Sequence, residues 1–188
     1  MERDLKELFP GRDIVRLADG RRVALPLHYS GPEGRKRWKR LSTKERGFVI
    51  KSIISFKFFF HYIFLPHQSV LDRERWPEKL PRHWEEFCDD VERTIPPDLC
   101  PFDKETREDG IYRMMRLWPT GSGKTTIVVR ALPLYLIAIN PNTSVLLGTS
   151  TTTLGERHVQ IHRNHLLHNK RLIECFGVQR RPDSTKTW

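Results

Sequence analysis

Cysteine is scarce in this chain, and its few cysteines form no recognisable pair. The 188 residues include Cys88, Cys100 and Cys175, and no C-x-x-C pair occurs. An odd number of cysteines without that spacing argues against a disulfide framework and against a common zinc site. The N-terminal segment, MERDLKELFPGRD, lacks the apolar core of a secretion signal. We therefore expect a protein of a reducing compartment, the cytoplasm.

Long apolar runs are also missing. The most hydrophobic stretch, residues 48–66, is interrupted by Lys51, Lys57 and His61. A membrane-spanning helix needs about 20 mostly apolar residues, and lysines at its centre are costly. The sequence therefore favours a helix from about Thr43 to Leu65 that is buried or partly buried in the protein, over a membrane span.

Acidic residues are outnumbered by basic ones. There are 33 Lys and Arg against 23 Asp and Glu, a net charge of +10. This excess favours an anionic partner, nucleic acid before membrane, with a well-solvated basic surface as the alternative. In residues 31–40, GPEGRKRWKR, five basic residues surround Trp38. We interpret this segment as a solvated linker in preference to a phosphate-binding patch with a stacking platform.

Apolar residues make up 38% of the chain and charged residues 30%, which indicates a globular protein with enough residues for one domain and its core. Asp19-Gly20 lies between two apolar runs and predicts a β-hairpin with a type I′ turn within residues 13–25. An amphipathic helix is predicted between residues 77 and 98, its acidic face exposed to solvent. The residues expected on its buried face are Trp84, Phe87, Cys88 and Val91.

The C-terminal part of the sequence predicts a strand, a loop, a helix, a second strand and a second helix. Residues 111–118 are the first strand, and 125–139 form an apolar helix that Pro133 should kink. The second strand is SVLLGTS, residues 144–150, apolar as in a buried parallel sheet. This order predicts an α/β fold containing a right-handed βαβα unit.

The last helix is expected to begin at a capping box formed by Thr153 and Glu156 and to end near Cys175, before Gly177. Its inward residues are predicted to be Leu154, Ile161 and Leu172. His158, His162, His165 and His168 are also spaced along this helix. The first two resemble the H-E-x-x-H zinc motif, but Val159 replaces its glutamate. We therefore favour a packed amphipathic helix over a metal site.

The stretch LWPTGSGKTTIVV, residues 117–129, has the features of a phosphate-binding loop. Glycines let the backbone curl so that several N–H groups face one anion, and a following helix adds its N-terminal dipole. Lys124 is predicted to be the catalytic cation at the β/γ-phosphates, and Thr125 the magnesium ligand. The predicted nucleotide-binding residues are Pro119, Thr120, Gly121, Ser122, Gly123, Lys124, Thr125 and Thr126.

The usual first glycine of this motif is replaced by Trp118. That position falls where the strand ends, and a residue before proline adopts an extended backbone. Trp118-Pro119 is therefore predicted to be the last step of the strand, which leaves the phosphate-contacting part of the loop intact.

The loop and its surroundings resemble the ATPase domain of phage terminase large subunits, the motors that package viral DNA. The resemblance covers about residues 48–188, and only the loop is a specific motif. Its other cues are the segments SFKFFFHYIFLP and LPRHWEEF upstream, and Asn140-Pro141, residues 145–149, residues 169–172 and Phe176-Gly177 downstream.

The resemblance implies an ATPase that uses ATP and Mg²⁺ to move double-stranded DNA in the host cytoplasm. Implied partners are DNA, a small terminase subunit, a portal protein and further copies in a ring, without a membrane. It also implies that residues 111–188 are the first βαβα half of a P-loop ATPase domain. The sequence pattern itself, outside the resemblance, predicts a basic N-terminal arm with a hairpin (residues 1–42) and a helical segment (43–110) before it.

Two departures from that family keep alternatives open. Many terminases have arginine where Thr120 stands, and PTGSGKT is the usual form in superfamily-two helicases, so a helicase-like translocase is one alternative. No apolar strand ending in Asp-Glu follows the loop, although these ATPases need one for magnesium and the attacking water. We therefore expect an N-terminal fragment that hydrolyses ATP poorly and lacks the terminase nuclease. A nucleotide-binding module without motor activity is the other alternative.

Overall fold

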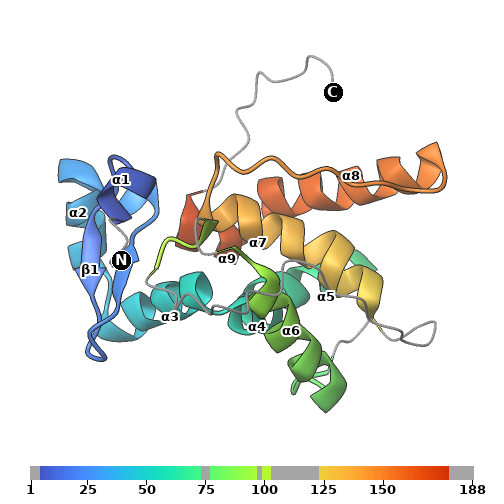
Figure 1. Cartoon of the computed structure of the whole chain (residues 1–188), viewed down its shortest axis with the longest axis horizontal. Helices are drawn as coiled ribbons and strands as arrows, with labels where there is room; N and C mark the ends of the chain where they lie inside the picture. The colour runs from blue at the N-terminus through green and yellow to red at the C-terminus, as the bar shows by residue number, and fades with distance from the viewer. Residues whose placement is uncertain (1–4, 73–76, 97–98, 103–122, 178–188) are drawn as a thin grey trace.

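The computed structural model describes residues 5–72, 77–96, 99–102 and 123–177, and most of them are helical (Figure 1). The first elements are α1 (Leu5–Leu8), β1 (Ile14–Arg16), β2 (Arg22–Ala24), η1 (Leu27–Tyr29), α2 (Gly31–Arg40) and α3 (Thr43–Ile54). The central ones are α4 (Phe56–Phe59), η2 (Phe60–Phe64), α5 (Leu65–Asp72) and α6 (Arg82–Thr94). The last are η4 (Thr125–Ala131), α7 (Leu132–Ile139), α8 (Thr152–His168) and α9 (Lys170–Phe176).

The predicted α/β fold with a parallel sheet is wrong. The described residues contain one sheet, in which β1 and β2 pair antiparallel. Residues 144–150, expected to be a buried strand, contain neither helix nor strand, and Leu146 is 98% exposed. A strand is stable only beside a paired neighbour, and no described strand lies beside this segment. The other expected strand, 111–118, lies outside the described residues.

The N-terminal hairpin is confirmed, with a different turn. Ile14 pairs with Ala24 and Arg16 with Arg22. The Gly20 N–H bonds to the Leu17 carbonyl, and the Leu17 N–H bonds to the Arg21 carbonyl. Gly20 has a φ of +89°. This pattern is a three-residue loop with glycine at its left-handed position, whereas a type I′ turn has two loop residues.

Residues 31–40 form helix α2, so the prediction of a linker is wrong. Gly34 lies directly on the backbone of Tyr29, and a Cβ on Gly34 would lie 2.4 Å from the Tyr29 carbonyl carbon. The Trp38 ring also packs edge-on against Tyr29, with 5.3 Å between ring centroids. These contacts hold α2 against η1 at one end of the molecule, on the left in Figure 1.

The helix expected from Thr43 to Leu65 is present but broken at Ser55. Ser42 and Glu45 form a capping box at the start of α3. Ser55 ends α3 and caps α4, and the Glu92 carboxylate accepts the Phe56 N–H at 2.9 Å. The helices Thr43–Ile54 and Phe56–Asp72 meet at 117°. Within the described residues, neither helix alone is long and apolar enough to span a membrane, although the bent pair passes that test by length and composition.

The main core is built around the aromatic residues of α4 and η2. Phe56, Phe59, Phe60 and Phe64 are fully buried, and Tyr135 of α7 lies against the first two. The predicted buried face of α6 is confirmed, because Trp84, Phe87, Cys88 and Val91 all join this core. The residues of this core run from Val23 to Phe176 along the chain. All three predicted segments, 1–42, 43–110 and 111–188, therefore contribute to one core.

The apolar helix at 125–139 is confirmed in two parts. Its first half, η4, has π-helical hydrogen bonds, with the Leu132 N–H bonded to the Ile127 carbonyl. The second half, α7, is an ordinary α-helix with Pro133 in its first turn. The change in bonding therefore coincides with the proline, which has no N–H to donate.

The last predicted helix is present as α8 and α9, divided at Asn169. Thr151 caps α8 by accepting the Leu154 N–H, so the capping box placed at Thr153 and Glu156 is wrong. Gly177 stops α9 with a φ of +65°, as predicted. Leu172 is buried as predicted, but Leu154 is 39% exposed, because the buried residues of α8 are His158 and His165.

Candidate functional site

The described part of the phosphate-binding motif lies at the start of η4. Gly123 has a φ of +83°, and its carbonyl accepts the Ile127 N–H at 3.0 Å. The helix therefore begins directly after Gly123, as the motif requires. Trp118, Pro119, Thr120, Gly121 and Ser122 lie outside the described residues.

The three motif residues after Gly123 differ in exposure. Lys124 is half-buried, the Thr125 side chain is exposed, and Thr126 is buried. In the first turn of a helix, a lysine suits the charge of a bound anion and an exposed hydroxyl suits the metal ion that accompanies it. Thr126 packs toward the core, so only its backbone N–H remains for the role predicted from the sequence.

The indole of Trp84 lies directly under Gly123. A Cβ on Gly123 would lie 2.6 Å from Cζ2 and 2.8 Å from Nε1 of that ring. Trp84 is itself packed edge-on against Phe60, with centroids 5.7 Å apart. Helix α6 therefore sets the position of the end of the loop. The sequence identified Trp84 as a core residue but carried no signal of this contact.

The helix that follows the loop is anchored in the core and by a histidine. Ile127 and Ala131 are fully buried. Nε2 of His162 in α8 lies 3.0 Å from the Val129 carbonyl oxygen and 3.1 Å from that of Arg130. A ring with Nε2–H donates to these carbonyls. Burial lowers the pKa of His162, which favours the neutral ring.

His165 belongs to a buried polar network, and not to a metal site. Its Nε2 lies 3.0 Å from Gln68 Oε1, its Nδ1 lies 3.2 Å from Asn169 Nδ2, and its ring stacks on Phe64. Asn169 also donates to the Ile63 carbonyl. Burial lowers the pKa of His165 to about 2, so the ring stays neutral. Among the described residues, no group of three or more His, Cys, Asp or Glu could hold a metal ion.

The sequence-predicted metal is Mg²⁺, bound with the nucleotide. The exposed Thr125 hydroxyl at the first turn fits one coordination position. Magnesium commonly takes its other ligands from the nucleotide phosphates and water. The residues present are thus compatible with magnesium brought by the nucleotide, and the described part of the chain offers no carboxylate cluster to hold it alone.

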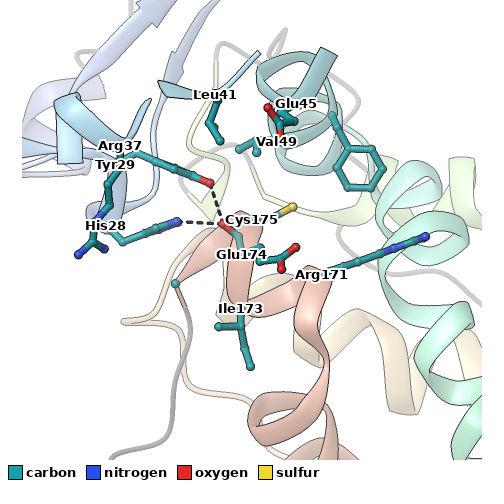
Figure 2. A pocket seen from close by; sticks show the side chains of 12 residues that line it. His28, Tyr29, Arg37, Leu41, Glu45, Val49, Arg171, Ile173, Glu174 and Cys175 are labelled. Atoms are coloured by element: carbon teal, nitrogen blue, oxygen red, sulfur yellow. Dashed lines mark hydrogen bonds between the residues drawn. The ribbon is translucent and has the colours of Figure 1, made fainter. Parts of the chain in front are cut away.

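A cleft of about 700 Å³ lies between α9 and the corner where α2 meets α3 (Figure 2). The Tyr29 hydroxyl donates to the Glu174 carbonyl at 2.7 Å, and His28 Nε2 lies 3.1 Å from the same oxygen. Val49 and Cys175 contribute apolar surface, and Arg37 and Arg171 contribute charge. Sequence reasoning missed this cleft because its two walls are more than 100 residues apart and neither carries a motif.

Comparison with known proteins adds no relative. No protein-family model, no curated protein and no solved structure matches this chain. The features of the chain that bear on function are therefore the loop motif, its position in the fold and the charge of the surface.

Proposed function

We propose that this chain binds magnesium ATP through residues 119–126 and is the ATP-binding part of a motor that moves double-stranded DNA. The observation that carries the proposal is the position of Gly123, Lys124 and Thr125. The glycine is in the left-handed conformation, and the lysine and threonine open a helix whose far side is buried. Helix N-termini of this kind bind phosphate through free N–H groups and the helix dipole.

Each residue has a separate role in this proposal. Lys124 neutralises the β- and γ-phosphates, and Thr125 coordinates magnesium. The N–H groups of residues 121–126 surround the phosphate oxygens, and Gly123 allows the backbone to curl.

The motor assignment is supported by the terminase-like order of motifs and by the net charge of +10. In such a motor, the partners of this chain would be a small terminase subunit, a portal protein and other copies of the same chain. Because no Asp-Glu pair follows the loop in this sequence, we expect the 188-residue chain to bind ATP but hydrolyse it slowly. Brisk magnesium-dependent turnover by the purified chain would contradict this expectation.

The test is a titration of the purified chain with magnesium ATP by calorimetry. Lys124→Ala removes a charged hydrogen-bond donor, worth about 1.5–3 kcal/mol, and should raise the Kd for ATP about 10- to 150-fold. Lys170→Ala is the matched control, because Lys170 is exposed in α9 outside the motif. Thr125→Val should instead weaken the dependence of ATP binding on magnesium, because one magnesium ligand is lost.

Two results would overturn the proposal. One is no measurable ATP binding by the unaltered chain. The other is equal ATP affinity in Lys124→Ala and Lys170→Ala.

A further inference from the structure

Half of the net charge of the molecule is concentrated at the corner formed by α2 and the start of α3. Residues 31–46 contain seven basic and two acidic residues. The basic residues are Arg35, Lys36, Arg37, Lys39, Arg40, Lys44 and Arg46. The inner side of α2 is occupied by Gly34 and Trp38 against Tyr29, so the cations occupy the solvent side.

Three of these cations have partners. Arg35 pairs with Asp13 at 2.9 Å, and Lys36 pairs with Glu33 at 2.8 Å. Arg46 donates to the carbonyls of Trp38 and Lys39, which fixes the turn between α2 and α3. The remaining four are all exposed, and none forms an ion pair with a described carboxylate: Arg37, Lys39, Arg40 and Lys44.

Helix stabilisation does not account for the whole group. Arg37, Lys39 and Arg40 lie in the last turn of α2, where cations favour the helix dipole. Lys44 lies in the first turn of α3, where a cation is unfavourable.

We propose that this corner, defined by Arg37, Lys39, Arg40 and Lys44, binds the phosphate backbone of double-stranded DNA. The inference rests on the DNA-moving part of the proposed function and names the surface that would contact the DNA. The four side chains extend from a rigid base, because Gly34 allows α2 to touch the Tyr29 backbone and Arg46 fixes the turn. A cluster of cations on a rigid base suits contact with the phosphates of a duplex backbone.

The aromatic residue of this surface argues for a duplex. Single-stranded nucleic acid is bound largely by stacking its bases on exposed aromatic rings. Trp38, the one aromatic residue in α2, is instead packed against Tyr29 and lies beside the Arg46 guanidinium. The surface therefore offers positive charge but no exposed aromatic ring on which a base could stack. This combination favours double-stranded DNA, whose bases remain paired, over a single strand.

The experiment measures binding of the 188-residue chain to a labelled 20-base-pair DNA duplex at several salt concentrations. The test variant carries Arg37→Gln, Lys39→Gln, Arg40→Gln and Lys44→Gln. The control variant removes the same charge from exposed residues elsewhere, through Lys51→Gln, Arg157→Gln, Arg163→Gln and Lys170→Gln. Each phosphate contact adds about 0.9 to the slope of log affinity against log salt, so four contacts add about 3.6. Between 50 and 200 mM salt, the unaltered chain should then lose about 150-fold more affinity than the test variant.

An unchanged slope in the control variant, with a slope lowered by about 3–4 in the test variant, is the expected result. An equal fall in both variants would show that only net charge matters and would overturn the proposal. Absence of DNA binding by the unaltered chain would also overturn it, while ATP binding in the same sample would leave the nucleotide site standing. If the fourfold variant does not fold, the pair Lys39→Gln and Arg40→Gln should give about half the change in slope.

Discussion

Replacing Gly123 with alanine tests the contact between the loop and Trp84 directly. Two features of the site oppose a side chain at this position. The backbone φ of +83° is one that L-residues rarely adopt. The new Cβ would also lie 2.6–2.8 Å from three atoms of the Trp84 ring, closer than non-bonded atoms approach.

The cost can be estimated from these two features. The left-handed conformation costs alanine about 1–2 kcal/mol. Overpacking a buried contact costs about 1–3 kcal/mol more, because the Trp84 ring is held by Phe60 and has little room to move. We therefore expect Gly123→Ala to lower the free energy of unfolding by about 2–5 kcal/mol.

Urea denaturation followed by circular dichroism measures this loss. Gly47→Ala is the control, since a Cβ there would have no neighbour within 4 Å and Gly47 lies inside helix α3. That substitution should stabilise the protein by about 0.5–1 kcal/mol, because alanine is the better helix former. Adding Trp84→Ala to Gly123→Ala should cost less than the two separate changes predict, because the clash is removed. Equal stability of Gly123→Ala and the unaltered chain would refute the reasoning.

Three further predictions concern the core. Tyr135→Phe leaves the Ile53 carbonyl without the hydroxyl that donates to it at 2.6 Å, so urea denaturation should show a free energy of unfolding lower by about 1–3 kcal/mol. The control Tyr62→Phe changes an exposed ring and should leave the free energy of unfolding almost unchanged. The pKa of His165 is lowered to about 2 from an unfolded value near 6.5, so the unfolded chain binds the proton first and the folded state loses stability as pH falls below about 6.5. Between pH 8 and pH 5, His165 should lower the free energy of unfolding by about 2 kcal/mol. Equal stability at the two pH values would contradict this prediction. Burial raises the pKa of Cys175 to about 12 and also raises the pKa of Cys88, and Cys100 is buried as well. A thiol reagent should therefore label the three cysteines only after unfolding, and rapid labelling of the native protein would show that this packing is wrong.

Local patterns in the sequence predicted local structure well. The hairpin, the buried face of α6 and the stop at Gly177 each depend on a few adjacent residues whose preferences agree with the surrounding fold. The phosphate-loop motif also placed a helix start after Gly123, where the structure has one.

Predictions that depended on distant partners were wrong. SVLLGTS has the composition of a buried strand, but composition does not supply the neighbouring strand that a sheet requires. The break at Ser55 depends on Glu92, which is 37 residues away along the chain and accepts hydrogen bonds from the start of α4. The inward face of α8 depends on Gln68, which gives His165 a polar partner inside the core. None of these partners can be identified from the segment that needs it.

The π-helical segment η4 acts as a spacer between the loop and the core. In an α-helix the Leu132 N–H would bond to the carbonyl four residues earlier. In η4 it bonds to the Ile127 carbonyl, five residues earlier, so the segment accommodates one extra residue. Each residue of an α-helix turns the chain by about 100°, so the same seven residues wound as an α-helix would rotate Gly123 and Lys124 by about that angle relative to Tyr135. Lys124 would then emerge from a different side of the helix, and Gly123 would no longer face Trp84. The direction in which the loop presents its lysine is thus determined by how a segment that touches no phosphate is wound.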